Sequence, residues 1–318
     1  MAESIKHRLL GHNIQRDDAS RYIGELLVRQ RVVNRTVLDF SQEYLSLGSF
    51  VIDACAGPEG SLLPAAIYGY QWLGNEVTQR FASNLAKSGA SRVVISDFSQ
   101  SPYQSKIADA VFFIFALNNI NDTPNALAEA ARVTHDRGIV VASDPGPTIS
   151  VARMVTHSLL GAERSPIPLK GNAFERGVPE FFADKNFTAD EYTDYLLERV
   201  FGVSRHELRG TALSIFGAAG KQSSHLYAFH SEIVRHYFNN LQREAQKAGF
   251  KLVKSGLTAT GKKQSGEWET ANPILVDPSD WMDQLLLARR NKNSETLFDQ
   301  IGTASTRLVY PILVFSKN

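Results

Sequence analysis

Residues 51–61 constrain the fold of this chain more than any other stretch, because an apolar run ends there in an acid and a glycine-containing turn. The run is typical of a buried strand, and Asp53 follows its two β-branched residues directly. Gly57 and Gly60 allow backbone angles and close approaches that larger residues do not. Ser61 is a good residue to begin a helix. The stretch predicts a strand, a tight loop with free N–H groups and a helix start, an arrangement that favours a nucleotide-like ligand.

Two further apolar segments also end in acids. Residues 70–76 end in Glu76, roughly twenty residues past the glycine loop, where an α/β sheet places the carboxylate that holds a ribose. The next segment ends in Asp97, followed by the aromatic ring of Phe98, a pair suited to the amino group and the flat face of an adenine. Three strand ends that each carry an acid predict a nucleoside site more strongly than a single glycine loop does.

These residues resemble the class I S-adenosylmethionine-dependent methyltransferases. Residues 53–60 are similar to the cofactor loop of that family, Glu76 to its ribose-binding acid, and Asp97 with Phe98 to its adenine-contacting pair. The resemblance implies S-adenosyl-L-methionine as the cofactor. The residues expected to bind it are Asp53, Ala54, Gly57, Pro58, Gly60, Glu76, Val77, Asp97, Phe98 and Asn118.

The resemblance continues in order along the chain, over about residues 48–148 and 228–318. Later family elements are similar to residues 108–120, 121–144, 241–253 and 311–315. The implied fold class is α/β, a doubly wound, mostly parallel, Rossmann-like sheet of seven strands. Cys55 and Glu59 depart from the pattern, since the family usually has glycine at these two places. Glu59 would repel a cofactor carboxylate unless its side chain points away or meets a positive group.

The regions outside this pattern predict a cap and an insert. Residues 1–47 show helical spacing and are expected to form an N-terminal helical cap before a methyltransferase domain over 48–318. Residues 149–227 form a helical insert after the fifth strand, and an insert with its own packing residues favours a substrate lid. Capping residues are expected at Thr78, at Thr123 before Pro124, and in two capping boxes, Thr188 with Glu191 and Ser204 with Glu207.

Composition narrows the class of protein. The chain has 318 residues, a formal net charge of +1, and basic residues spread among acids, so it does not favour a nucleic-acid partner. We find neither an apolar run near twenty residues nor a signal peptide, so we expect a cytoplasmic protein without a membrane span. The single Cys55 excludes a disulfide within the chain and a cysteine cluster for a metal.

Methyl transfer mainly requires that donor and acceptor are aligned, with a base where the acceptor must lose a proton. It requires no metal. His225 is the preferred base, because it lies where the insert rejoins the sheet. Asn118 and Asp144 follow the fourth and fifth strands and are candidates to hold the cofactor or the acceptor. Four tyrosines are candidates to line an acceptor pocket: Tyr22, Tyr103, Tyr192 and Tyr227.

The hypothesis is methyl transfer to an oxygen or nitrogen of a small-molecule acceptor, and a homodimer is a further expectation. RNA methylation ranks lower, although the glycine loop is also similar to that of the ribose 2′-O RNA methyltransferases. The aspartate which that family has after the fourth strand is asparagine here, and the sequence shows no basic face to bind phosphates. A nicotinamide-dependent oxidoreductase would share the first loop and acid, but no Tyr-x-x-x-Lys pair accompanies them. A non-catalytic, methyltransferase-like scaffold subunit stays open, with Glu59 as its best support.

Overall fold

The computed structural model describes residues 32–57, 60–117, 120, 122–144, 146–147, 149–161, 189–217, 223–262, 265, 267–290 and 307–318. These residues fall into two compact units. The first, here called the α/β unit, lies within Asn13–Pro145 and Glu244–Asn318. The second, the helical unit, lies within Gly146–Arg243.

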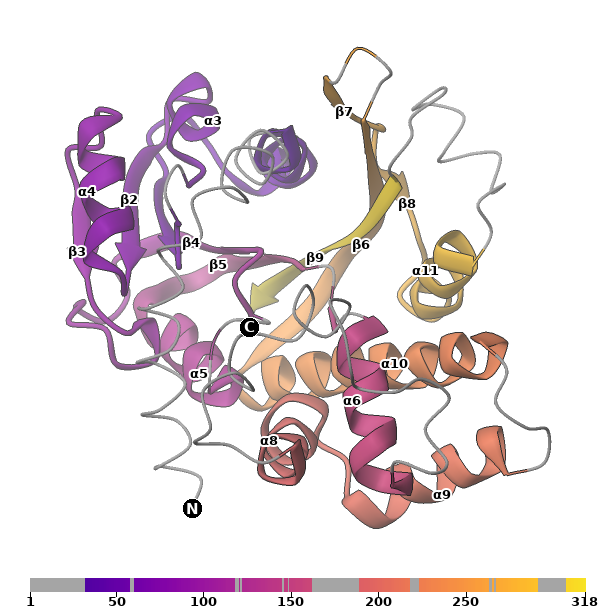
Figure 1. The fold of residues 1–318 in the computed structure, drawn as a ribbon. Helices are drawn as coiled ribbons and strands as arrows, with labels where there is room; N and C mark the ends of the chain where they lie inside the picture. Colours follow the sequence, from indigo (N-terminus) through magenta and orange to yellow (C-terminus); the bar gives the residue numbers. More distant parts are fainter. Residues whose placement is uncertain are drawn as a thin grey trace. The chain divides into compact units, whose positions relative to one another are not determined.

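The α/β unit is built on one sheet, which has nine strands among the described residues (Figure 1). The strands are β1 (Phe50–Ala54), β2 (Gln71–Glu76), β3 (Val93–Ile95), β4 (Ala108–Ile114), β5 (Thr134–Ser143), β6 (Phe250–Lys262), β7 (Trp268–Thr270), β8 (Ile274–Leu275) and β9 (Arg307–Lys317). Their order is β3-β2-β1-β4-β5-β9-β6-β7, and β8 pairs with β6. The first two strands of the chain therefore lie next to each other, and the order reverses between β1 and β4.

The strand directions confirm a mostly parallel, doubly wound sheet. β1 to β5 form four parallel pairs, whereas β9 is antiparallel to both β5 and β6, so that β6 runs in the direction of β5. The expected number of seven strands was too low. The short strands β7 and β8 pair antiparallel with β6, which is long enough to hold both.

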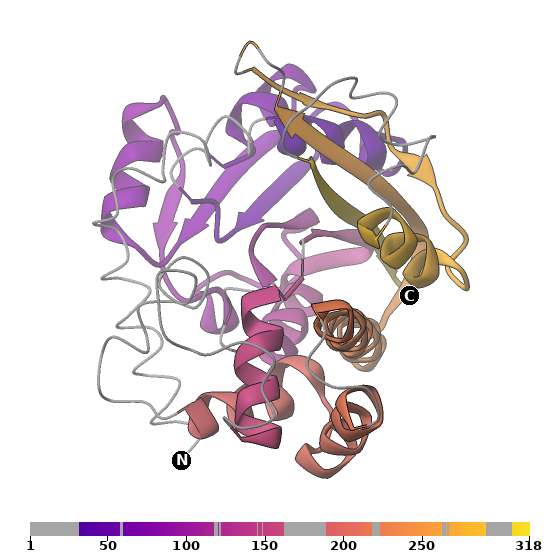
Figure 2. The ribbon, with the colours of Figure 1, turned by 45° about the vertical axis from the view of Figure 1, so that its right-hand side comes forward.

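Helices of the α/β unit pack on the strands that precede or follow them (Figures 1 and 2). They are α3 (Leu62–Ile67), α4 (Gln79–Lys87), the 3-10 helix η3 (Phe98–Gln100), α5 (Thr123–Val133) and α11 (Trp281–Arg290). α3 and α4 contact β2, α5 contacts β5 and η3, and α11 contacts β6 and β9. Parallel strands covered in this way have few polar positions, and Val51 to Ala54 are all buried.

Residues 32–41 form a helix that packs into the sheet, in agreement with the helical pattern of this part of the chain. Its side chains Val33, Val37 and Leu38 are fully buried in one cluster with residues of β1, β4 and β9. The 3-10 helix η2 (Gln42–Tyr44) follows it. The rest of the predicted cap, residues 1–31, lies outside the described residues.

Three predicted helix caps differ from the structure. Ser61 precedes α3 and Thr78 precedes α4, but neither side chain caps its helix. The Ser61 hydroxyl donates to Asp53 instead. Thr123 is the first residue of α5, and Asp122 is its cap, accepting from the N–H of Asn125. An aspartate side chain is at least as good an N-cap acceptor as threonine, so α5 begins one residue earlier than predicted.

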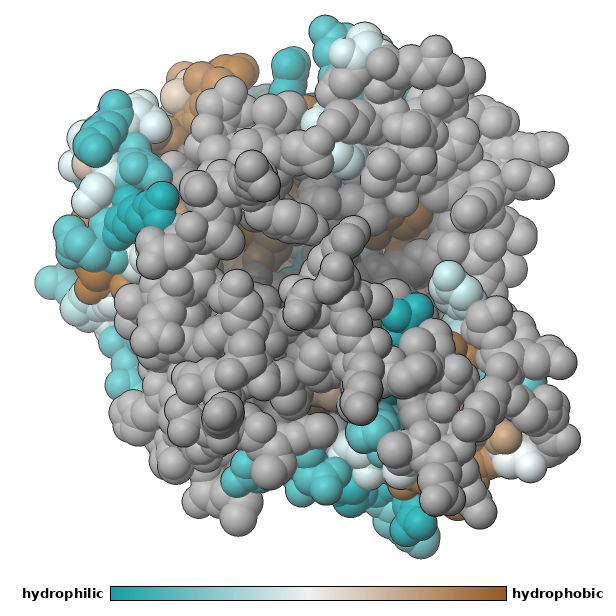
Figure 3. Space-filling model, in the orientation of Figure 1, coloured by the Kyte–Doolittle hydropathy of each residue, from teal (hydrophilic) through white to brown (hydrophobic). Residues whose placement is uncertain are grey.

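The outer face of α3 is apolar (Figure 3). Leu63 and Ile67, one helical turn apart, keep 64% and 62% of their surface exposed, and Leu47 keeps 85%. Four-residue spacing places the first two side chains on the same face. In the described part of the chain this face is therefore open to solvent.

The helical unit is compact and contains fully buried apolar side chains, among them Phe201, Leu208 and Phe229. It contains α6 (Ile149–Leu160), α8 (Ala189–Tyr195), the π-helix η6 (Leu196–Phe201), α9 (Arg205–Phe216) and most of α10 (Ser223–Lys247). Arg205 joins α9 to α8 and α6, because its guanidinium contacts Asp194 at 2.7 Å and the Ser158 hydroxyl at 2.9 Å. These charges are partly exposed, so the packing of apolar side chains provides most of the stability.

One prediction for this unit can be compared with the structure. The capping box at Ser204 is confirmed in its first half, since the Ser204 hydroxyl accepts from the Glu207 N–H at 3.1 Å. Thr188, of the other box, lies outside the described residues. At the end of η6, Val200 is only half-buried, whereas Phe201 is 1% exposed. The wider π turn of η6 shifts the buried face by one residue.

Candidate functional site

Five parallel strands bring their carboxyl ends to one edge of the sheet in the α/β unit. In the register of the sheet, Ala54 at the end of β1 lies beside Asn75 of β2, and Glu76 lies beside Ile95 of β3. Ligands of open α/β sheets lie beyond this edge, next to the point where the strand order reverses. The edge formed by β1, β2 and β3 is therefore the candidate site.

The backbone leaves β1 through a series of left-handed conformations. Cys55 has a φ of 57°, Gly57 of 66° and Gly60 of 55°. Phe115, the residue after β4, also has a φ of 57°. A non-glycine residue with such a φ is strained, and strained residues gather at functional sites. The two non-glycine examples here both stand immediately after a central strand.

Asp53 is a buried carboxylate that closes the glycine loop. Its Oδ2 accepts the Ser61 N–H at 2.5 Å and the Ser61 hydroxyl at 2.7 Å, and the Trp72 indole N–H donates to the same hydroxyl at 3.1 Å. A Cβ on Gly60 would lie 2.9 Å from that Oδ2, so only glycine fits there. Burial raises the pKa of Asp53 to about 6, although the Ser61 donors act to lower it.

Glu76 links the ends of β2 and β1. Its Oε2 accepts the Gly57 N–H at 2.8 Å and its Oε1 accepts the Thr78 N–H at 2.9 Å, while the side chain is 5% exposed. Burial raises its pKa, and hydrogen bonds from the backbone N–H groups of Thr78, Gly57 and Val77 and from the Thr78 hydroxyl oppose this shift.

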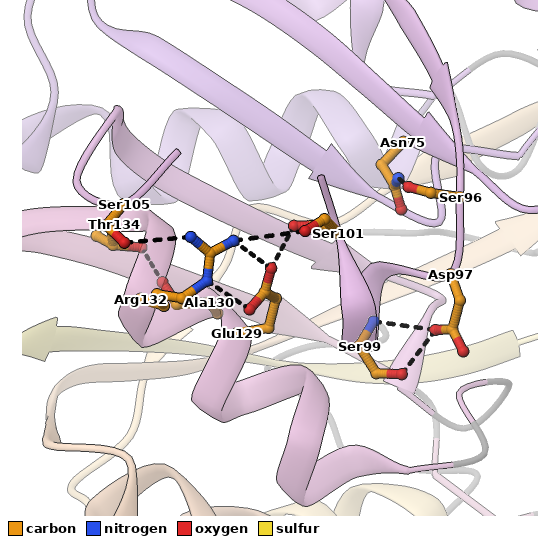
Figure 4. Close-up of polar contacts among 10 residues, drawn as sticks. All are labelled: Asn75, Ser96, Asp97, Ser99, Ser101, Ser105, Glu129, Ala130, Arg132 and Thr134. Atoms are coloured by element: carbon orange, nitrogen blue, oxygen red, sulfur yellow. Dashed lines mark hydrogen bonds and ion pairs between the residues drawn. The ribbon is translucent and has the colours of Figure 1, made fainter. Parts of the chain in front are cut away.

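Asp97 caps the short helix η3 at the end of β3. Its Oδ1 accepts the Ser99 N–H at 2.9 Å and the Ser99 hydroxyl at 2.8 Å (Figure 4). Phe98 is 2% exposed, and its ring lies edge-to-face with Phe113 of β4 at 5.4 Å between centroids. The ring that was predicted to face an adenine therefore lies in the core of the α/β unit.

The three acids act on the pKa of one thiol, that of Cys55. Burial raises the pKa of Cys55 well above its ordinary value, and the negative charges of Glu76, Asp97 and Asp53 raise it further, in that order. Charges act on the thiol in this way only from a short distance. Among the described residues, no lysine or arginine forms a salt bridge with any of the three carboxylates. The edge formed by β1, β2 and β3 is therefore acidic.

Polar residues next to these acids complete the edge. The Asn75 amide donates to the Ser96 hydroxyl at 2.7 Å (Figure 4), and Asn75 is fully buried. Burial raises the pKa of Tyr103 to about 12, and both Asn75 and Cys55 act on its hydroxyl. Asn75 and Ser96 immediately precede Glu76 and Asp97 in the sequence, so their position at this edge of the sheet could have been predicted. The ring of Tyr103, expected to line an acceptor pocket, lies 6.4 Å from that of Phe98 between centroids.

An ion pair fastens the segment that follows η3. Arg132 of α5 donates to Glu129 at 2.8 Å and to the Ser105 hydroxyl at 3.2 Å, and Ser101 also donates to Glu129 (Figure 4). Although burial raises it, the hydrogen bonds from Arg132 and Ser101 hold the pKa of Glu129 below its ordinary value. These contacts fix the segment that carries Tyr103.

The residues expected on the acceptor side lie in different units. Asp144 follows β5 in the α/β unit and is 1% exposed. His225 belongs to the helical unit, where its ring contacts Phe216 at 6.2 Å between centroids. His230, on the same helix α10, lies 2.8 Å through Nε2 from the Pro147 carbonyl, three residues beyond Asp144. Sequence reasoning did not single out His230, because this contact spans 83 residues.

The remaining predicted site residues have no contact that defines a role, or lie outside the described residues. Ala54 is buried and Val77 is half-buried next to Glu76. Pro58, Glu59 and Asn118 lie outside the described residues, as does Tyr22, and the side chain of Tyr192 is not described. Tyr227 is 60% exposed. In the ranges that the structure describes, no three His, Cys, Asp or Glu side chains are grouped as a metal site requires, and no helix is both long and apolar enough to span a membrane.

Comparisons with known proteins agree with this geometry. Residues 52–142 match a family model described as a methyltransferase domain. A search of curated proteins finds no match. Two similar solved structures are a possible histamine N-methyltransferase from Thermotoga maritima (14% identity, TM-score 0.46, covering 96% of this chain and 99% of that one) and the geranyl diphosphate C-methyltransferase from Streptomyces coelicolor A3(2) (9% identity, TM-score 0.41, 91% and 80%). At these identities and TM-scores they support no conclusion about the substrate.

The strand order and the glycine loop beyond β1 define a Rossmann-like α/β fold of the nucleotide-binding type. The family match over residues 52–142 identifies this part of the chain as a methyltransferase domain. S-adenosyl-L-methionine is the methyl donor that such domains use.

Proposed function

We propose that this chain transfers the methyl group of S-adenosyl-L-methionine to an oxygen or nitrogen atom of a small organic acceptor. The observation that carries the cofactor site is the position of Asp53, Glu76 and Asp97 at the carboxyl ends of the neighbouring strands β1, β2 and β3, with Glu76 bound to the Gly57 N–H of the glycine loop. An acidic edge without a described cationic partner suits a ligand that brings hydroxyl groups and positive charge. The cofactor has both.

Each end of the cofactor has candidate partners in the chain. Glu76 would accept from the ribose hydroxyls, with Val77 beside it. Asp97 would accept from the adenine amino group, supported from the core by Phe98. The loop would hold the methionine part through Ala54, Gly57, Pro58 and Gly60. Asp53 fixes that loop by accepting hydrogen bonds from Ser61. Asn118 would lie over the methyl donor.

When bound, S-adenosyl-L-methionine would supply a methyl group bonded to a sulfonium: an acceptor lone pair would form the bond to the methyl carbon as the C–S bond breaks, and the electron pair of that bond would leave S-adenosylhomocysteine with a neutral thioether sulfur. The chain aligns the acceptor and excludes water around it. We assign Asp144 to hold the acceptor by a hydrogen bond. We assign His225 as the base that takes the acceptor proton, since an imidazole changes protonation near neutral pH.

We also propose a role for each remaining region of the chain. We propose that residues 149–227 form a lid over the acceptor, that residues 1–47 cap the cofactor, and that residues 48–318 are the methyltransferase domain. The lid proposal is supported by the compactness of the helical unit and its buried apolar side chains. We further propose a homodimer that acts in the cytoplasm, on a small molecule rather than on nucleic acid.

Calorimetric titration with S-adenosylhomocysteine, followed by a labelled-methyl assay on metabolite and RNA fractions, tests the proposal. We expect binding that is lost in Glu76→Ala and label in the metabolite fraction. Asp109→Ala is the matched control, because Asp109 also accepts a backbone N–H, that of Phe50 at 2.8 Å, but at the start of β1. Wild-type protein that binds no S-adenosylhomocysteine at millimolar ligand would contradict the proposal, and label in RNA alone would contradict the acceptor class.

A further inference from the structure

Asn34 fixes the glycine loop from the N-terminal helix. Its side-chain amide nitrogen donates to the Gly60 carbonyl oxygen at 2.5 Å, and the residue is 1% exposed. The next N–H in the chain, that of Ser61, belongs to the same peptide group and donates to Asp53. Asn34 and Asp53 therefore hold the two ends of one peptide bond, on opposite sides of it, because a trans peptide directs its C=O and N–H in opposite directions.

The other end of the Asn34 side chain is a buried carbonyl oxygen. This Oδ1 has no hydrogen-bond partner among the described residues. Its identity as oxygen follows from the contact with Gly60, since a backbone carbonyl only accepts and the amide nitrogen must face it. A buried acceptor that stays without a donor is destabilising, and its retention points to a partner that arrives with a ligand.

The surroundings indicate which donor this is. Asp53 and Glu76 lie at the same loop, and in the described part of the chain neither forms a salt bridge with a basic residue. A cationic donor is therefore favoured over a neutral one. If Glu76 and Asp97 hold the adenosine, the donor left for the Gly60 end of the loop is the ammonium group of the methionine part.

We propose that Asn34 is a cofactor-binding residue, which holds the Gly60–Ser61 peptide with its amide nitrogen and accepts a hydrogen bond from the cofactor ammonium group with its Oδ1. This inference rests on the proposed cofactor site. It adds a contact from the N-terminal helix to a loop that otherwise binds through its own backbone. A residue that only stabilised the loop would affect every nucleoside ligand equally, whereas Asn34 acts on the amino-acid part.

Calorimetry with two ligands separates these roles. S-adenosylhomocysteine carries the amino-acid part with its ammonium group, and 5′-methylthioadenosine has the same adenosine without the amino-acid part. For Asn34→Leu we expect the affinity for S-adenosylhomocysteine to fall roughly ten- to hundredfold more than the affinity for 5′-methylthioadenosine. Asn239→Leu, at an exposed position of α10, is the matched control and is expected to bind both like the wild type.

Asn34→Asp decides the case if Asn34→Leu does not fold, because it keeps an oxygen where the ammonium group would bind. We expect it to retain the affinity for S-adenosylhomocysteine within a few-fold. Equal losses for both ligands in Asn34→Leu, no loss for either, or an Asn34→Asp variant that binds only 5′-methylthioadenosine would overturn the inference. Wild-type protein that binds neither ligand would instead remove the proposed function itself.

Discussion

The chain leaves β1 and β5 through loops that are fixed in different ways. After β1, Asp53 and Glu76 accept N–H groups from residues 8 and 19 positions away, so the loop is closed by its own sequence neighbours. After β5, the Pro147 carbonyl contacts His230 across 83 residues, and a Cβ on Gly146 would lie 3.2 Å from the Phe238 ring. The first loop is formed by local chemistry, and the second takes its shape from helix α10.

The largest expected effect is at the first loop. Asp53→Ala would leave the N–H and hydroxyl of Ser61 without their buried acceptor, and we expect it to lower the free energy of unfolding by about 2–3 kcal/mol. Binding of S-adenosylhomocysteine should then be undetectable. Chemical denaturation and calorimetry measure the two effects. Asp53→Asn keeps one oxygen and should lose less, and equal stability of the alanine variant and the wild type would show that Asp53 does not close the loop.

The next largest effect is expected at two histidines of α10, His225 and His230. Once the labelled-methyl assay has supplied an acceptor, we expect His225→Gln to lower kcat about a hundredfold, with unchanged binding of S-adenosylhomocysteine, because a base is lost. His230→Gln can still donate to Pro147 through its side-chain amide and should change kcat only a few-fold. A large loss in His230→Gln together with normal activity in His225→Gln would transfer the role of base to His230.

The pH dependence of stability tests the environment of Asp53. Its pKa is raised in the folded protein, to about 6 from 3.8. The folded state therefore binds more protons than the unfolded state between these values, and stability falls as the pH rises from 4 to 6. We expect this carboxyl to contribute a fall of about 3 kcal/mol. The free energy of unfolding of the wild type minus that of Asp53→Asn, measured from pH 4 to 7, should show the fall, and a flat difference would contradict it.

A smaller effect is expected at Glu76. Glu76→Gln keeps an oxygen but replaces the other with an amide group, which cannot accept both the Gly57 and Thr78 N–H groups as the carboxylate does. We expect binding of S-adenosylhomocysteine to weaken about tenfold in calorimetry, since one hydrogen bond to a charged group is lost. Glu198→Gln, which alters a carboxylate that is 67% exposed on η6, is the comparison and should bind as the wild type does.

The same contrast explains what the sequence could predict. The order of β1 to β5 and the three acids at strand ends were predictable, because buried parallel strands are continuous apolar runs and their carboxyl ends share an edge. The environment of Phe98 was not, since its packing on Phe113 of β4 depends on tertiary structure. The partners of His230 and Asn34 were not predictable for the same reason. β7 and β8 were missed because strands of three and two residues leave almost no periodicity.

A crystal structure of the full chain with S-adenosylhomocysteine bound tests the central claim most directly. The account predicts ribose hydroxyls within hydrogen-bonding distance of Glu76, with the adenine next to Asp97 and the thioether end along the glycine loop. A nucleoside bound elsewhere, or bound without contact to either carboxylate, would contradict it.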